Sequence, residues 1–117
     1  MPDKVNIATS AAGLALNQYL QLGRLNNHVL TVIRTEERVL EFHVHEHSDE
    51  MFFVTEGSMQ VEFGDGLVTL EAGEFLIVPA GVPHRPVCHD PVTCLLIEKA
   101  GTLTKENTGG AYSDTVR

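Results

Sequence analysis

One stretch of nine residues carries most of the information in this chain: it reads FHVHEHSDE and covers residues 42–50. Three of the six histidines lie inside this stretch, within the five consecutive residues 43–47. Side chains alternate between the two faces of a β-strand, so His43 and His45 are expected to point the same way, with backbones about 7 Å apart. Two imidazoles at that spacing can bind one ion. Phe42 and Val44 are then expected on the opposite, packed face.

Glu50 ends this stretch and opens the next predicted strand, where alternation places Phe52 and Val54 on the same face as the glutamate. A carboxylate on an apolar strand face is costly to bury unless it is paired with a cation or bound to one. Metal ligation removes that cost, and Glu50 is therefore a candidate ligand beside the two histidines. The alternative is a surface turn that is merely rich in histidine and acids, with histidines that form ordinary hydrogen bonds.

A second informative segment lies downstream and reads GEFLIVPAGVPH over residues 73–84. An apolar run is followed there by a Pro-x-Gly turn, a strong turn signal, and then by His84. A distant histidine in so distinct a context strengthens the interpretation of the first stretch as part of a metal site.

The two segments together resemble the two sequence motifs of the cupin superfamily. The first cupin motif contains His-x-His, three or four residues, Glu, six residues and Gly, and this chain matches it at four positions: His43, His45, Glu50 and Gly57. The alternative pair His45 and His47 would leave only two residues before the glutamate, so the spacing favours the first pair. His47 is then expected at the rim of the site or behind its ligands.

The second cupin motif contains Gly, five residues, Pro-x-Gly, two residues and His, and the chain matches it at four positions: Gly73, Pro79, Gly81 and His84. The 15 residues between the two motifs (58–72) match the short spacing of small microbial cupins. Two positions depart from the family pattern. Glu37 stands where the first motif begins with Gly, and Cys88 stands where the second motif ends with Asn.

This resemblance implies an all-β fold, the double-stranded β-helix or jelly-roll barrel of the cupins. It also implies that four side chains converge at the barrel mouth on one divalent transition metal ion, Fe, Mn, Ni or Zn: His43, His45, Glu50 and His84. From about residue 5 to residue 103 the chain is similar to small single-domain cupins of the mannose-6-phosphate isomerase-like (cupin 2) group. That similarity implies a homodimer.

The rest of the sequence fits the same fold class. From His28 onward, short runs rich in Val, Ile, Phe and Thr alternate with turns, which predicts an antiparallel jelly roll. The one helix-like pattern covers residues 9–22, ending at Gly23. We expect one domain, with an N-terminal segment 1–27, a barrel 28–103 and a polar tail 104–117. The predicted strands cover residues 29–34, 39–45, 50–56, 58–63, 67–71, 74–79, 84–88 and 92–98.

The charge and the cysteines limit the partners and the compartment. The 117 residues include 16 acids and 8 Lys or Arg, a formal charge of −8. This charge disfavours nucleic acid and anionic membranes, because both need a positive surface. No apolar run approaches the roughly 20 residues that span a bilayer. One disulfide between Cys88 and Cys94 is arithmetically possible, but reduced thiols in a cytoplasmic protein are the simpler interpretation.

Three histidines and a carboxylate suit metal-centred chemistry, and the sequence contains no nucleophile triad and no glycine-rich phosphate loop. Three hypotheses about function follow. The protein is a metal-dependent enzyme, either an oxygenase or an isomerase of sugar-like molecules. Alternatively, it is a non-catalytic module that binds or senses a small ligand, or a barrel that its metal only stabilises. The sequence does not identify the small-molecule ligand.

Overall fold

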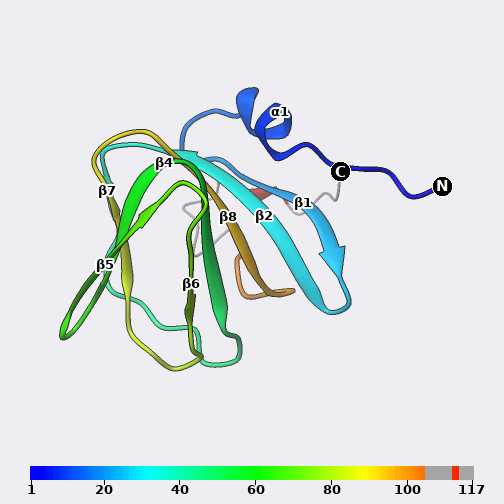
Figure 1. Ribbon diagram of the computed structural model, residues 1–117. Helices are drawn as coiled ribbons and strands as arrows, with labels where there is room; N and C mark the ends of the chain where they lie inside the picture. The colour runs from blue at the N-terminus through cyan, green and yellow to red at the C-terminus, as the bar shows by residue number, and fades with distance from the viewer. Residues whose placement is uncertain (105–111, 114–117) are drawn as a thin grey trace.

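The computed structural model describes residues 1–104 and 112–113. Within them the chain forms one short helix and nine strands (Figure 1). These elements are α1 (Ile7–Ala12), β1 (Tyr19–Leu25), β2 (His28–Thr35), β3 (Arg38–Val39), β4 (Glu50–Phe63), β5 (Gly66–Glu71), β6 (Phe75–Val78), β7 (Arg85–Cys88), β8 (Val92–Lys99) and β9 (Tyr112–Ser113).

The strands form a curled sheet that is antiparallel except for the pair of β1 with β9. The long strand β4 holds its two halves together. Its first half pairs with β6 and β8, and β8 continues through β2 to β1, whereas its second half pairs with β5 and β7. The prediction of an all-β jelly-roll barrel with a short N-terminal helix is therefore confirmed.

A bulge between Val54 and Glu56 lets β4 pass from one half of the sheet to the other. Gly57 follows this bulge with φ of +78°, and a Cβ at this position would overlap the carbonyl oxygen of Pro91. The glycine at the end of the first motif is thus required by the close approach of β8. Glu37, which replaces the glycine at the start of that motif, also has a positive φ of +47°. Glu37 thus adopts a left-handed backbone conformation, which glycine takes more easily than other residues.

The core has two parts, one inside the barrel and one outside it. Inward-facing residues of β4 and β8, including Val54, Val61 and Cys94, pack inside the barrel. Helix α1 covers the outer face of β1 and β2, where Ala11 and Leu14 pack against Leu20, Leu22, Val32 and Leu95. Both cysteines are buried and unpaired.

The helix is shorter than the sequence pattern predicts, and it begins earlier. The side chain of Asn6, not of Thr9 or Ser10, caps it by accepting a hydrogen bond from the Thr9 amide at 2.9 Å, and Gly13 ends it. Residues 19–22, predicted as helix, belong instead to β1 and pair with β2. Pairing with a buried strand outweighs the loose helical spacing of the leucines. The curled sheet therefore begins within the predicted segment 1–27.

The predicted strand 39–45 is also wrong over most of its length. Only Arg38–Val39 forms β3, and His43 joins the sheet through a single bridge to His84. Phe42 and Val44 are not packed as predicted, since they remain 45% and 39% exposed. The predicted strands 50–56 and 58–63 form one continuous strand, β4. Most of the predicted tail 104–117 lies outside the described residues.

None of the helical segments in residues 1–104 and 112–113 combines the length and the apolar character that crossing a membrane requires.

Candidate metal centre

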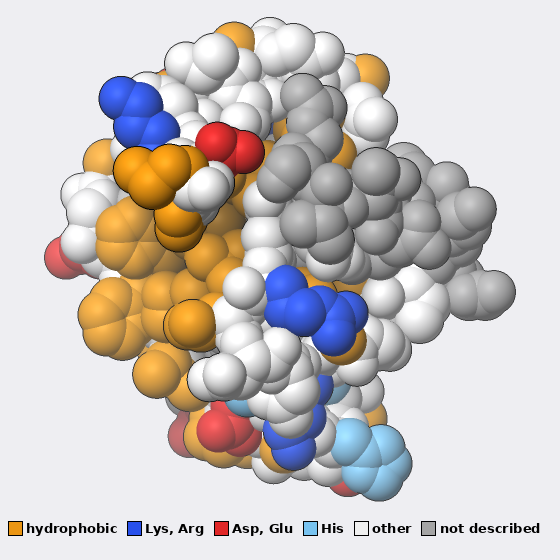
Figure 2. All heavy atoms as spheres, turned by 90° about the vertical axis from the view of Figure 1, so that its right-hand side faces the viewer, with side chains coloured by type: hydrophobic (Ala, Val, Ile, Leu, Met, Phe, Trp, Pro, Cys, Tyr) orange, Lys and Arg blue, Asp and Glu red, His pale blue; other side chains and the backbone are white. Residues whose placement is uncertain are grey.

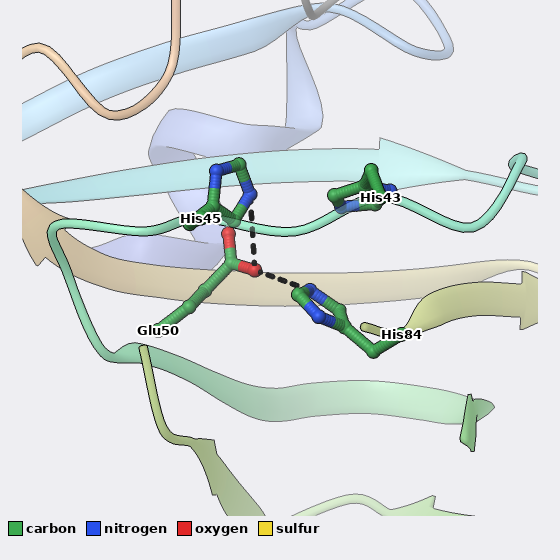
Figure 3. Close-up of side chains that lie close together, drawn as sticks. All are labelled: His43, His45, Glu50 and His84. Carbon is green, nitrogen blue, oxygen red and sulfur yellow. Dashed lines mark hydrogen bonds and ion pairs between the residues drawn. The ribbon is translucent and has the colours of Figure 1, made fainter. Parts of the chain in front are cut away.

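Four side chains from three separate segments lie close together and point toward one another (Figure 3). His43 and His45 lie in the extended segment after β3, Glu50 is the first residue of β4, and His84 directly precedes β7. The structure therefore brings together all four residues that the motif spacing selects. One donor atom from each of them lies within 4.8 Å of the donor atoms of the other three.

The carboxylate of Glu50 is the centre of this cluster. Its Oε1 lies 3.0 Å from Nε2 of His84 and 3.6 Å from Nε2 of His45. Glu50 and His84 are 3% and 1% exposed, so both groups are removed from water. The Nε2 atom of His45 is buried and has no hydrogen-bond partner among the described residues. A buried nitrogen without a partner fits a site that a cation completes.

Backbone carbonyls orient two of the imidazole rings. Nδ1 of His43 donates to the carbonyl of Glu41 at 3.0 Å, and Nδ1 of His84 donates to the carbonyl of Val82 at 2.9 Å. Nε2 of His84 also donates to the Glu50 carboxylate, and this nitrogen gives up its proton when an ion binds. Because a carbonyl only accepts, both Nδ1 atoms carry a proton, and the two Nε2 atoms are the ones directed to the cluster. This is the arrangement in which histidines bind metal ions.

The cluster fits a divalent transition metal ion. Two ligands at about 2.1 Å from the same ion are at most about 4.2 Å apart, so small side-chain rotations close the present spacing. Three imidazole nitrogens and one carboxylate oxygen form a donor set that suits Fe, Mn, Ni or Zn. The donor set alone does not select one of these ions.

Burial and mutual contact shift the pKa values of the cluster. Burial alone would raise the pKa of Glu50, but the hydrogen bond with His84, the nearness of Glu98 and the nearby imidazoles hold it below its ordinary value. Burial would lower the pKa of His84, but its hydrogen bond to Glu50 raises the net value. The pKa of His45 is lowered, chiefly by burial. Glu50 is therefore a carboxylate at neutral pH, ready to bind a cation.

Glu98 is a buried acid beside the cluster that the sequence analysis does not single out. Met51 on β4 pairs with Ile97 on β8. Because the two strands are antiparallel, the next residues along, Glu50 and Glu98, lie opposite each other. Glu98 is 0% exposed, and burial followed by contact with Glu50 raises its pKa well above the ordinary value. Burial beside Glu50 therefore favours the uncharged form of Glu98, whose two carboxyl oxygens have no hydrogen-bond partner among the described residues. Its alternation with Cys94 and Leu96 along the strand is the signal that could have revealed it.

Three of the four cluster residues, His43, His45 and Glu50, line a cleft of about 400 Å³, a size that suits a small organic molecule. Apart from the cluster itself and Glu41, the lining side chains are apolar or aromatic: Tyr19, Leu40, Phe42, Val44, Phe52, Pro86, Leu96 and Leu103.

Two further residues considered from the sequence lie apart from the cluster. His47 is exposed and lines a surface depression with Lys99 and Thr102, on the other side of His45 from the cleft. Cys88, at the position of the usual asparagine, is buried, and its sulfur lies 4.0 Å from Oγ1 of Thr35. Neither side chain is among the four whose donor atoms converge.

The fold is a β-barrel that carries a cluster of side chains able to hold a metal ion. Comparison with known families identifies the family of this barrel. The cupin domain family matches residues 29–98, more than half of the chain. The chain therefore belongs to the cupin domain family.

A known relative by sequence is protein SchB of Streptomyces halstedii, which is 38% identical over 56 residues. The match covers 48% of this chain and 40% of SchB, less than half of that protein's length. A cupin-2 domain protein of Shewanella frigidimarina NCIMB 400 has a similar structure, with a TM-score of 0.76 and 27% identity over 81% of this chain and 93% of that chain. Hydroquinone 1,2-dioxygenase PnpCD, solved with Cd²⁺ and 4-hydroxybenzonitrile, shares the fold at a TM-score of 0.69 and 23% identity, covering 82% and 72%.

Proposed function

We propose that this cupin binds one divalent transition metal ion through His43, His45, Glu50 and His84 and is an enzyme that uses the ion to transform a small molecule. The observation that carries the proposal is the position of the cluster, three of whose four residues line a cleft of about 400 Å³. When bound, such an ion supplies Lewis acidity and, in the case of iron, reactivity toward dioxygen. Four protein donors leave two positions of a six-coordinate ion for a ligand.

The residues of the chain bind, orient and shield the reacting centre. The carbonyls of Glu41 and Val82 hold two rings with Nε2 directed to the cluster. The buried acid Glu98 lies beside Glu50 on the neighbouring strand and excludes water from that side of the carboxylate. Apolar side chains such as Phe52 and Leu96 keep water away from the substrate.

Within this class we propose an oxygenase rather than an isomerase of sugar-like molecules. A sugar needs many hydrogen-bonding side chains, whereas the cleft lining outside the cluster is almost entirely apolar or aromatic. An isomerase also needs a general base, and Glu50 is unsuited to that role while it binds the ion. An apolar lining suits an aromatic or aliphatic substrate. The fold shared with a hydroquinone dioxygenase is compatible with this proposal.

An oxygen-uptake experiment tests the proposal. Protein loaded with Fe(II) under anaerobic conditions is mixed with oxygen and a panel of catechols, hydroquinones and hydroxy acids, with the Zn(II)-loaded protein and His84→Ala as controls. We expect uptake that requires Fe(II), a member of the panel and His84. Absence of uptake across the panel, together with an unchanged spectrum of the Co(II)-loaded protein on addition of the same compounds, would contradict the enzyme proposal.

The second candidate is a non-catalytic module in which the ion only stabilises the barrel. The barrel interior is well packed without it, since Val54, Val61 and Val78 are 0–1% exposed. We therefore expect His84→Ala to lose metal affinity and keep a cooperative thermal transition. Global unfolding when the metal is chelated would favour the stabilising role instead.

We also propose that the protein is a cytoplasmic homodimer. A row of apolar side chains on the outer face of β6 and β4 supports the dimer, because Phe75 and Ile77 are 57% and 52% exposed and lie opposite Phe53 and Met51. Figure 2 shows how hydrophobic side chains gather on one side of the molecule. The two unpaired cysteines are compatible with a reducing compartment.

A further inference from the structure

A contact between Tyr19 and Arg38 closes the barrel where its strands are not paired. Tyr19 lies on β1 and Arg38 on β3, which stand toward opposite ends of the strand order. Nη1 of Arg38 donates to the hydroxyl of Tyr19 at 3.1 Å, and the guanidinium carbon lies 5.5 Å from the centre of the tyrosine ring. The guanidinium is thus held at a fixed place between the two halves of the sheet.

The same two residues line a small cavity of about 40 Å³. Its other lining side chains carry no charge: Ile33, Thr35, Leu40, Phe52, Met59, Pro86, Cys88, Cys94 and Leu96. The cavity adjoins the metal cleft, since Tyr19, Leu40, Phe52, Pro86 and Leu96 line both. A molecule in the metal cleft therefore lies next to the cavity that Arg38 lines.

Arg38 has no acidic partner among the described residues, although the chain carries 16 acids and only 8 Lys or Arg. Arg85 provides the contrast, because its Nε donates to the carboxylate of Glu62 at 2.6 Å. A guanidinium has five N–H groups, and Arg38 directs one of its nitrogens to the hydroxyl of Tyr19. The remaining donors form a planar fork that suits a carboxylate.

We infer that Arg38 binds the carboxylate of a small apolar acid whose other end reaches the metal centre. The length of the ligand follows from the strands. Arg38 pairs with Cys88, which is four residues, or about 13 Å of strand, from His84. The side chains at both ends reduce this span, so the acid is shorter than about 13 Å. The claim that the other end of the acid reaches the metal ion rests on the proposed function. The binding of its carboxylate by Arg38 does not.

Binding of a matched pair of probes to the full-length protein tests this inference. The probes are 3-phenylpropanoate and its uncharged amide, 3-phenylpropanamide, titrated by calorimetry into metal-free and Zn(II)-loaded protein. We expect the acid to bind about tenfold more tightly than the amide in both forms, because the charge-assisted hydrogen bonds to Arg38 need no metal. Arg38→Met removes the charge and should abolish the preference, whereas Arg38→Lys should keep part of it.

One further variant is the control. Arg24→Met changes an exposed arginine on the same strand as Tyr19 and should keep the full preference for the acid. Thermal melts check that each variant is folded.

Equal binding of acid and amide to the wild-type protein, or no binding of either, would overturn the inference, and so would an acid preference that survives in folded Arg38→Met. These results are separate from a failure of the proposed function. Failure of the metal site would appear as loss of metal binding or oxygen uptake, while the preference in the metal-free protein remained.

Discussion

The backbones of His43 and His84 hydrogen-bond to each other in both directions. The amide of His43 donates to the carbonyl of His84 at 2.9 Å, and the amide of His84 donates to the carbonyl of His43 at 3.0 Å. This bridge joins the two cupin motifs directly at the candidate ligands. Two ligands that are 41 positions apart are therefore placed by main-chain bonds, which makes the site preorganised before any ion binds.

Replacement of Gly57 should destabilise the fold strongly. Its φ of +78° and the carbonyl of Pro91 leave no room for a Cβ, so Gly57→Ala combines backbone strain with a clash. We expect a loss of about 3 kcal/mol or more in the free energy of unfolding. Gly64→Ala is the matched control, because no atom lies within 4 Å of its added Cβ. Denaturant unfolding of both variants makes the comparison, and equal stability would contradict the role assigned to Gly57.

Glu98 should make the stability of the metal-free protein depend on pH. Its pKa in the folded state is raised well above 4.5 by burial and by Glu50, so folding takes up a proton. The contribution of protonated Glu98 to stability is fully present below the pKa of Glu98 in the unfolded chain. It is lost as the pH rises from about 4.5 toward the pKa of Glu98 in the folded protein. Glu98→Gln cannot ionise at this position. Relative to this variant, the free energy of unfolding of the wild-type protein should fall by roughly 1 kcal/mol per pH unit in that window.

Urea unfolding of both proteins between pH 4.5 and 8 measures this difference. The exposed Glu56 provides a control, since Glu56→Gln should leave the curve parallel to that of the wild type. A constant difference between wild type and Glu98→Gln across the range would show that Glu98 is ionised in the fold.

The proposed dimer should depend on the outer face of β6. Light scattering at micromolar concentration should give about twice the monomer mass of 12.8 kDa. The double variant Phe75→Ser/Ile77→Ser should be a monomer, because it removes the exposed apolar side chains of the row. Leu67→Ser, at an equally exposed position on β5, should stay dimeric. A wild-type mass near 12.8 kDa would contradict the proposal.

The motif spacing predicts the fold class and the family, both of which are confirmed. The spacing works because it reflects local constraints. Gly57 is fixed by a close strand contact, and Glu50 begins a strand whose alternate residues Phe52 and Val54 are buried. The set of four residues that it selects is the set whose donor atoms converge.

Other features depend on contacts that no local pattern contains. Tyr19 lies in a loosely helical stretch, and only its pairing with Ile33 on β2 makes it part of a strand. The extended segment around His43 forms a single bridge, to His84, and two further main-chain hydrogen bonds join its Leu40 to Pro86 and its His45 to Gly81. The contact of Tyr19 with Arg38 joins two halves of the sheet, so neither residue alone indicates it.

The metal content of the purified protein tests the central claim most directly. Protein reconstituted under reducing, anaerobic conditions and freed of loosely bound ions should contain about one transition metal ion per chain by elemental analysis. The double variant His43→Ala/His45→Ala should contain none, whereas His47→Ala, which changes an exposed histidine outside the cluster, should bind as wild type does. A wild-type protein that retains no metal after reconstitution, or a double variant that retains as much as the wild type, would contradict the account.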